Sequence, residues 1–359
     1  MAKPNASRTY EIVHSHLLWW LLAAYALGAF WPGPGEWIRG ALPDQLIPGD
    51  HHAGVLLKGM LAVLLFNAGL GIDLNAVKQI GRRLAMLFVV PVIGFVAPAI
   101  YLVVLSFLPS GSLSPELAYA LLFGVAVVGA MPAAASSTGW AQTANGNMAI
   151  SCGLVVTTTF FSPLGVWLML GLARWIWGAA GFDAAILPSK ETFSAFSYAT
   201  AAVIAIWGLV PMGIGIAARQ GVGNENYQRA KPYVKLITVA VILLLNYTNA
   251  SISLPRLVSQ PEWGTIGLIL CVMVGLCVVQ YSAAYPLIRL FRTDRSERMS
   301  LYFAMGMRNN GAGLVLIASC FDKSEVIILT VIMYTLIQHL AAGFMNRFQR
   351  ESVEVTEET

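Results

Sequence analysis

Ten apolar runs of about membrane-spanning length divide this chain, and they constrain its fold more than any other feature. They lie at about 16–31, 53–72, 84–107, 117–131 continuing through a polar interruption, 148–177, 195–218, 233–254, 263–290, 300–320 and 324–346. A helix needs about 20 apolar residues to cross a bilayer. Only 11% of the residues are charged, against roughly 25% in soluble domains. We therefore predict an all-α polytopic membrane protein with ten transmembrane helices.

The distribution of basic residues predicts the topology. With a cytoplasmic N-terminus, the inner segments carry Lys3, Arg8, Lys78, Arg82, Arg83, Arg219, Arg229, Lys231, Lys235, Arg289, Arg292, Arg295, Arg298, Arg347 and Arg350, and the outer ones carry Arg39, Arg174, Lys190, Arg256 and Lys323. This asymmetry of 15 to 5 follows the positive-inside rule. We predict a multi-pass protein of the cell (inner) membrane with both termini cytoplasmic, because no Ser/Arg-rich leader directs it to an organelle.

Polar stretches interrupt the fourth run of each half, at 132–147 (PAAASSTGWAQTANGN) and 306–313 (GMRNNGAG). Unpaired backbone groups are costly in hydrocarbon, so such stretches must be packed in protein or line a wet cavity. Five helices per half give the halves opposite orientations, and inverted repeats with matching discontinuous helices are typical of transporters. In the alternative interpretation, each break is a loop between two separate short helices, which would disturb the charge asymmetry.

These patterns divide the chain into four parts. We predict a first repeat at 1–177, a connecting loop at 178–194, a second repeat at 195–346 and a cytoplasmic tail at 347–359.

Three motifs, in order on three runs, resemble the bile acid:sodium symporter family. They are FNAGL at 66–70, GNMAIS at 146–151 and GMRN at 306–309. The resemblance covers essentially all ten runs. It implies a panel domain of two helix pairs and a six-helix core domain, with the discontinuous helices four and nine crossing near the midplane.

The resemblance also implies sodium ligands, of which only part are present. Ser137 and Ser151 fall where the family has hydroxyl ligands, and Thr138 replaces an asparagine but keeps an oxygen. Apolar residues or an arginine stand at the other positions, namely Ile93, Val155, Ala304 and Arg308. Na⁺ is the candidate coupling ion, with Ser137, Thr138 and Ser151 as its remaining ligands, and we expect its coupling to be weakened or lost.

The charge inventory favours an anionic substrate. All 18 acidic residues fall in loops, tails or helix ends, whereas Arg308 lies at the second interruption. An unpaired cation in the membrane costs about 2.5 kcal/mol or more, so something negative should offset it. Half-helices that begin near Ser136 and Gly311 would direct N–H groups at an anion. The guanidinium group itself suits a carboxylate, sulfonate or phosphate.

Two other interpretations of Arg308 stay open. Its side chain could reach the inner surface or bond exposed carbonyls of the broken helix. Alternatively, the guanidinium could substitute for the missing sodium as a built-in cation.

The predicted substrate-binding residues gather around the two interruptions. They are Arg308, Asn309, Asn310, Ser136, Ser137, Thr138 and Gln142. His339 is expected to be a satisfied core histidine rather than a proton carrier. The polar tract at 246–251 is expected to form interhelical hydrogen bonds or to line a cavity.

These observations favour a secondary transporter of a small or amphipathic organic anion that works by alternating access. The alternative within the same fold is a sodium-independent exchanger or uniporter. A membrane enzyme or sensor is a third class, but no catalytic or phosphate-binding motif and no metal-ligand spacing of the four cysteines supports it. The expected partners are the lipid bilayer and the organic anion, with no nucleic acid.

Overall fold

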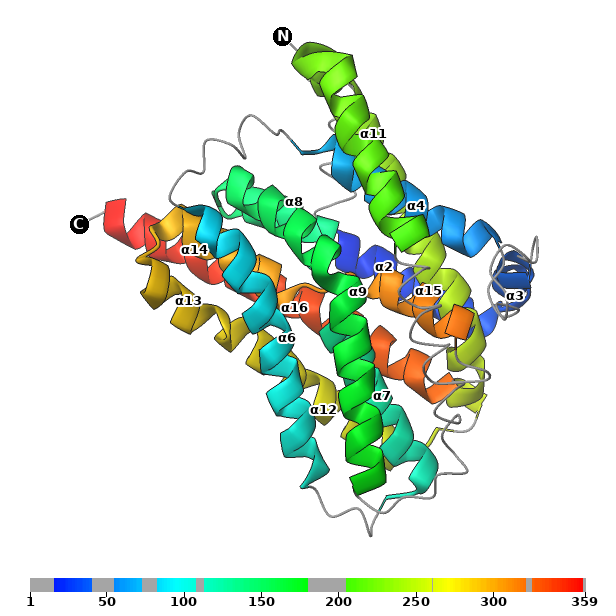
Figure 1. The fold of residues 1–359 in the computed structure, drawn as a ribbon. Helices are drawn as coiled ribbons and strands as arrows, with labels where there is room; N and C mark the ends of the chain where they lie inside the picture. Colours follow the sequence, from blue (N-terminus) through cyan, green and yellow to red (C-terminus); the bar gives the residue numbers. More distant parts are fainter. Residues whose placement is uncertain are drawn as a thin grey trace. The chain divides into compact units, whose positions relative to one another are not determined.

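The computed structural model describes residues 16–40, 55–72, 83–107, 113–179, 205–259, 261–320 and 325–357. These residues form helices and turns, with one isolated β-bridge and no strand among them (Figure 1). Five helices within these ranges are long and apolar enough to cross a membrane, and three shorter apolar helices accompany them. The all-α polytopic class is confirmed, whereas the ten-helix inverted repeat stays a prediction.

The chain forms two compact units that each combine three segments. Unit 1 comprises Met1–Asp73, Pro188–Gly267 and Gly311–Ile332, and unit 2 comprises Leu74–Leu187, Leu268–Asn310 and Met333–Thr359. Both units draw on both halves of the sequence. They therefore leave the predicted repeat boundaries at 177 and 195 untested.

Unit 1 contains a helix with a sharp internal bend. Among the described residues it contains α2 (Leu17–Phe30), α3 (Gly33–Gly40), α4 (Val55–Leu70), the π-helical turn η4 (Ala205–Leu209), α11 (Val210–Ser259), nearly all of α15 (Asn310–Cys320) and the first residues of α12 (Trp263–Ser282) and α16 (Glu325–Glu357). The two arms of α11 meet at Gly223. Its φ of 76° is positive, and glycine adopts positive φ values at no steric cost. The Arg219 guanidinium lies 4.0 Å from the Tyr227 ring centroid, although eight residues of straight helix would separate their Cα atoms by about 12 Å. The arms correspond to the apolar runs predicted at 195–218 and 233–254.

Close helix approach and hydrogen bonds hold unit 1 together. A Cβ on Gly69 would collide with the Met212 carbonyl, so α4 and α11 can pack this closely only at a glycine. The Tyr25 hydroxyl donates to Asn246 Oδ1 (2.8 Å), and the Tyr247 hydroxyl donates to the Trp31 carbonyl (2.8 Å). The polar tract at 246–251 thus makes the interhelical hydrogen bonds that the sequence predicts.

Unit 2 is built around buried helices. It contains α6 (Leu84–Ser106), α7 (Pro115–Ala130), α8 (Ala135–Thr143), α9 (Met148–Ala179), most of α12 (Trp263–Ser282), α13 (Ala284–Phe291), α14 (Arg295–Gly306) and the C-terminal part of α16 (Glu325–Glu357). At the start of α7 the Ser114 hydroxyl accepts from the Leu117 N–H (3.3 Å), and Pro115 supplies a preset φ. Most of α7 is buried and apolar on all sides, as expected of a helix inside a bundle.

Both predicted interruptions are present. Helix α7 ends at Ala130 and α8 begins at Ala135, and α14 ends at Gly306 before α15 (Asn310–Cys320) begins. With 9 residues, α8 is too short to cross a bilayer alone. A turn at 144–147, with Asn145 at a φ of 56°, separates α8 from α9.

Candidate functional site

The two interrupted segments pair with each other in unit 2. The Ala134 N–H donates to the Met307 carbonyl (2.8 Å), and the Asn309 N–H donates to the Pro132 carbonyl (2.8 Å). These two bonds form an antiparallel bridge between Ala133 and Arg308. We call this paired region, residues 131–134 and 306–310, the crossover.

Side chains from α9 and α16 satisfy four further backbone groups of the crossover. The Gln338 amide accepts from the Arg308 N–H (2.9 Å) and donates to the Arg308 carbonyl (3.3 Å). The Tyr334 hydroxyl donates to the Gly306 carbonyl (3.1 Å), and Thr158 Oγ1 accepts from the Ala133 N–H (3.1 Å). Irregular backbone at membrane depth persists only where its polar groups are paired in this way.

The Arg308 side chain is 1% exposed and binds oxygens from three helices. Its Nη1 donates to the Met131 carbonyl (3.2 Å), and its Nη2 donates to the Gly94 carbonyl (2.9 Å) and to Gln280 Oε1. We call these three acceptors the oxygen cage. Within the described ranges, no carboxylate forms an ion pair with Arg308, and its Nε has no hydrogen-bond partner there.

Two helix defects leave the cage carbonyls available. Pro98 lies within α6 and has no N–H, so the Gly94 carbonyl four residues earlier lacks its helical donor. Met131 is the C-cap that follows α7 and is extended (φ −69°, ψ 144°), so its carbonyl belongs to the interruption and not to the helix. A Cβ on Gly94 would lie only 3.3 Å from Arg308 Nη2, so the absent side chain makes room for the guanidinium.

The resemblance to the bile acid:sodium symporter family implies polar ligands at three positions that here lie in one apolar cluster. Val155 and Ala304 are buried there, and Ile93 packs against the same cluster. None of the three side chains carries an oxygen that could bind a cation. The space that they share is filled by hydrocarbon contacts from α6, α9 and α14.

The other predicted site residues differ in their surroundings. Ser137 and Ser151 are fully buried, and neither hydroxyl has a hydrogen-bond partner in the described part of the chain. Asn310 donates through Nδ2 to Thr335 Oγ1 (2.9 Å), whereas its Oδ1 has no partner among the described residues.

Asn309 belongs to the crossover by its backbone, while Ser136 and Thr138 lie half-buried in α8. The side chain of Gln142 lies outside the described residues. Substrate or cation binding by any of these residues stays a prediction.

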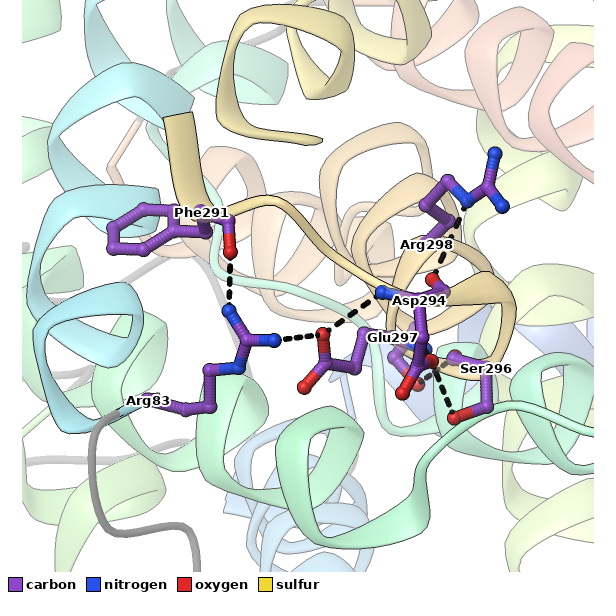
Figure 2. Close-up of polar contacts among 7 residues, drawn as sticks. Arg83, Phe291, Asp294, Ser296, Glu297 and Arg298 are labelled. Carbon is purple, nitrogen blue, oxygen red and sulfur yellow. Dashed lines mark hydrogen bonds and ion pairs between the residues drawn. The ribbon is translucent and has the colours of Figure 1, made fainter. Parts of the chain in front are cut away.

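Polar contacts join the first turn of α14 to neighbouring segments of unit 2 (Figure 2). Arg83 forms an ion pair with Glu297 (2.8 Å) and donates to the Phe291 carbonyl. Asp294 caps α14 by accepting from the Glu297 N–H (2.9 Å), and the Glu297 carboxylate accepts from the Asp294 N–H (3.1 Å). This N–H bond from Glu297 is the main cause that lowers the pKa of Asp294. The two reciprocal bonds form a capping box.

The same turn of α14 fixes the start of α9. The Asn147 N–H donates to the Ser296 carbonyl (3.0 Å), and the Ser300 hydroxyl donates to the Asn147 carbonyl (2.8 Å). Asn147 Oδ1 in turn accepts from the Ile150 N–H (3.2 Å) and caps α9. The charge-derived topology assigns Arg83, Asn147 and Ser296 to the inner side. Their contacts with the first turn of α14 bring the three together, and the side of the membrane that they face stays a prediction.

Several residues that bind Arg308 were not predicted from the sequence. Gln280 and Gln338 are buried amides within apolar runs, and an intramembrane polar residue is itself a signal of interhelical bonding. Gly94 had a signal too, because a proline follows it by four residues. His339 is buried, and its Nδ1 donates to the Thr335 carbonyl (2.7 Å), as expected of a core histidine.

Comparison with known proteins finds one family and one curated relative. The sequence profile of the SBF-like CPA transporter family matches residues 16–351, nearly the whole chain. The uncharacterized protein YbaS of Bacillus subtilis (strain 168) is 26% identical over 233 residues, which cover 63% of this chain and 69% of that protein.

Proposed function

Since the chain belongs to the SBF-like CPA transporter family, we propose that it is a secondary transporter that carries a small or amphipathic organic anion by alternating access. The family match covers the crossover and every apolar run from residue 16 onwards. The resemblance to the bile acid:sodium symporter family is thereby confirmed at the level of the family, and the protein is a membrane transporter. The substrate and its coupling are the proposed part.

The observation that carries this proposal is the pairing of two helix interruptions through the bridge between Ala133 and Arg308. Helix ends and unpaired backbone amides at membrane depth are the usual ligands of transporter sites. Helices α8 and α15 begin at this crossover, and the partial positive charge of their N-termini favours an anion.

The proposed substrate ligands are the polar groups at these helix starts. They are Ser136, Ser137, Thr138, Gln142, Asn309 and Asn310, with Arg308 as the positive charge beside them. The buried Ser137 hydroxyl supports this assignment, because it has no partner among the described residues and can donate to an anion. A buried polar atom without a partner is costly, and a bound ligand would remove that cost.

A second candidate is a sodium-independent exchanger or uniporter of the same fold. The apolar cluster that holds Ile93, Val155 and Ala304 favours it, because these positions offer no oxygen to a sodium ion. Ser137, Thr138 and Ser151 remain as possible ligands, and each offers only one hydroxyl oxygen. A membrane sensor is the alternative from another class, and it predicts binding without uptake.

The experiment has two steps. Purified protein is first screened by thermal shift against organic carboxylates, sulfonates and phosphates, since a ligand that binds the folded state raises its stability. Uptake of the hits into proteoliposomes is then measured, with protein-free liposomes as the control. We expect at least one hit to accumulate faster in proteoliposomes. Hits that bind but are never taken up would contradict transport and favour the sensor.

Replacing sodium by choline in the same assay separates the two transport candidates. A sodium symporter loses uptake in choline, whereas the exchanger or uniporter keeps it. The structure favours retained uptake, because the replaced positions leave so few cation ligands.

A further inference from the structure

The oxygen cage around Arg308 has the composition of an alkali-cation site. It consists of two main-chain carbonyls, of Gly94 and Met131, and the amide oxygen of Gln280. Carbonyl oxygens released by unwound backbone replace the hydration shell of monovalent cations in channels and transporters. Here a guanidinium holds those oxygens instead.

Helix dipoles add to the attraction for a positive charge at this place. Helices α7 and α14 both end at the crossover, and the C-terminal end of a helix carries a partial negative charge. Arg308 donates to the Met131 carbonyl at the end of α7, and its own backbone follows the end of α14. The negative end of α7 thus contacts the guanidinium, and the end of α14 lies two residues before Arg308 in the chain.

Fixed dipoles, rather than an acidic side chain, accompany the charge of Arg308. No ion pair joins it to a carboxylate in the ranges that the structure describes. The guanidinium is always protonated, and it is less strongly hydrated than an ammonium ion or a metal cation. A permanent cation therefore suits this buried cage of neutral oxygens.

We infer that Arg308 is a tethered cation of the crossover, whose guanidinium fills the oxygen cage that a free monovalent cation would otherwise occupy. The inference rests on the proposed transporter function, because it concerns the ion that such a transporter would otherwise bind at the crossover. Since this cation is covalently attached, the crossover needs no exchangeable ion to hold its helix ends together. Removing the side chain should then create an empty site that a free cation can enter.

The test is chemical rescue of the purified protein in detergent. Arg308→Ala should lower the Tm relative to wild type. Guanidinium chloride at low millimolar concentration, far below denaturing levels, should raise the Tm of Arg308→Ala with a saturable dependence. Wild type and the control variant Arg289→Ala, which removes an exposed arginine of α13, should show no such rise. An unchanged Tm of Arg308→Ala, or an equal response of the control, would overturn the inference.

Two further measurements keep the inference testable if Arg308→Ala does not fold. Gln280→Leu removes one cage oxygen but leaves the guanidinium in place, so its Tm should fall and guanidinium should not restore it. For wild type, the Tm should be the same in sodium buffer as in choline buffer. A wild-type Tm for Gln280→Leu, or a saturable sodium-dependent rise in wild type, would refute the tethered cation.

None of these measurements involves a substrate, so they can refute the tethered cation without bearing on the proposed transport function. Rescue without any detectable uptake would contradict the transporter alone. Uptake that depends on sodium, together with absent rescue, would contradict the tethered cation alone.

Discussion

Thr158 is the clearest case of a single side chain that fixes the crossover. Its hydroxyl accepts from the Ala133 N–H (3.1 Å) and donates to the Leu154 carbonyl of its own helix (2.6 Å). Among the described residues, the neighbouring Thr157 donates only to carbonyls of α9. The two threonines thus form a natural pair, in which one bridges to the crossover and the other does not.

Thr158→Val keeps the side-chain volume but leaves the buried Ala133 N–H without an acceptor. We expect a loss of about 1–3 kcal/mol of stability, measured as a fall in Tm of the purified protein. Thr157→Val is the control and should leave the Tm nearly unchanged, because only a local bond within α9 is lost. Equal effects of the two substitutions would show that the bond to Ala133 contributes nothing.

Gly94→Ala tests the space reserved for the guanidinium. The added Cβ would lie 3.3 Å from Arg308 Nη2 and 3.5 Å from Nη1, so Arg308 must shift away from the cage. Overpacking of this kind costs about 1–3 kcal/mol, so we expect a lower Tm. Gly171→Ala in α9 is the control, because a Cβ there meets nothing within 4 Å. A Gly94→Ala protein as stable as that control would contradict the close contact.

At the residue scale, the sequence identifies the charge but not its partners. Arg308 stands out because an arginine within an apolar run is rare. Gly94 and Gln280, which supply two of its acceptors, lie more than 200 and nearly 30 residues away, respectively, and only the fold brings them together. Pro98 could have indicated the free carbonyl of Gly94, but it could not identify the donor.

At the element scale, the first turn of α14 connects α6, α13 and the start of α9. Its capping box has the Asp294-to-Glu297 spacing that defines such boxes, so the start of α14 could have been read from the sequence. The interruptions at 131–134 and 307–309 were also predictable, because proline, glycine and amides interrupt apolar runs there. Their mutual pairing depends on backbone bonds between segments more than 170 residues apart, and no local pattern encodes it.

The Asp294 cap gives α14 a pH dependence that can be measured. The pKa of Asp294 is lowered from its ordinary value of 3.8, mainly because its carboxylate accepts from the Glu297 N–H. Its charge therefore stabilises the folded state fully above pH 3.8. That contribution is lost as the pH falls through the lower folded-state pKa. Asp294→Asn keeps a capping oxygen without the charge. The Tm difference between wild type and Asp294→Asn should therefore shrink as the pH is lowered below about 3.8, and a constant difference would contradict this account.

Asp294→Ala removes the cap altogether. Loss of a capping side chain costs about 1 kcal/mol, so the Tm should fall at neutral pH. Asp294→Asn serves as the matched control, because asparagine is itself a good N-cap residue. An Asp294→Ala variant with the same Tm as wild type would mean that the cap does not stabilise α14.

At the scale of the whole molecule, the predicted topology assigns sides to the turns between helices. Asn226 follows the bend in α11 and should face the cytoplasm, whereas Glu262 precedes α12 and should face outward. Both side chains are exposed. In a cysteine-free background, a membrane-impermeant maleimide added to sealed right-side-out vesicles should label Glu262→Cys and spare Asn226→Cys. Labelling of both, or of Asn226→Cys alone, would contradict the ten-helix topology.

The fold class and the positions of the two interruptions follow from apolar length and polar content, which are properties of single segments. The grouping into two units does not, because each unit combines segments from both halves of the chain. Burial of Ile93, Val155 and Ala304 in one apolar cluster was likewise visible only in the structure, although their identity had already raised doubt about sodium.

Equilibrium binding of radioactive sodium to the purified protein tests the tethered cation most directly. Wild type should bind no sodium that unlabelled sodium displaces, because the Arg308 guanidinium holds the oxygens of Gly94, Met131 and Gln280. Arg308→Ala should show more displaceable sodium than wild type. Saturable sodium binding to wild type that Arg308→Ala leaves unchanged would contradict the account.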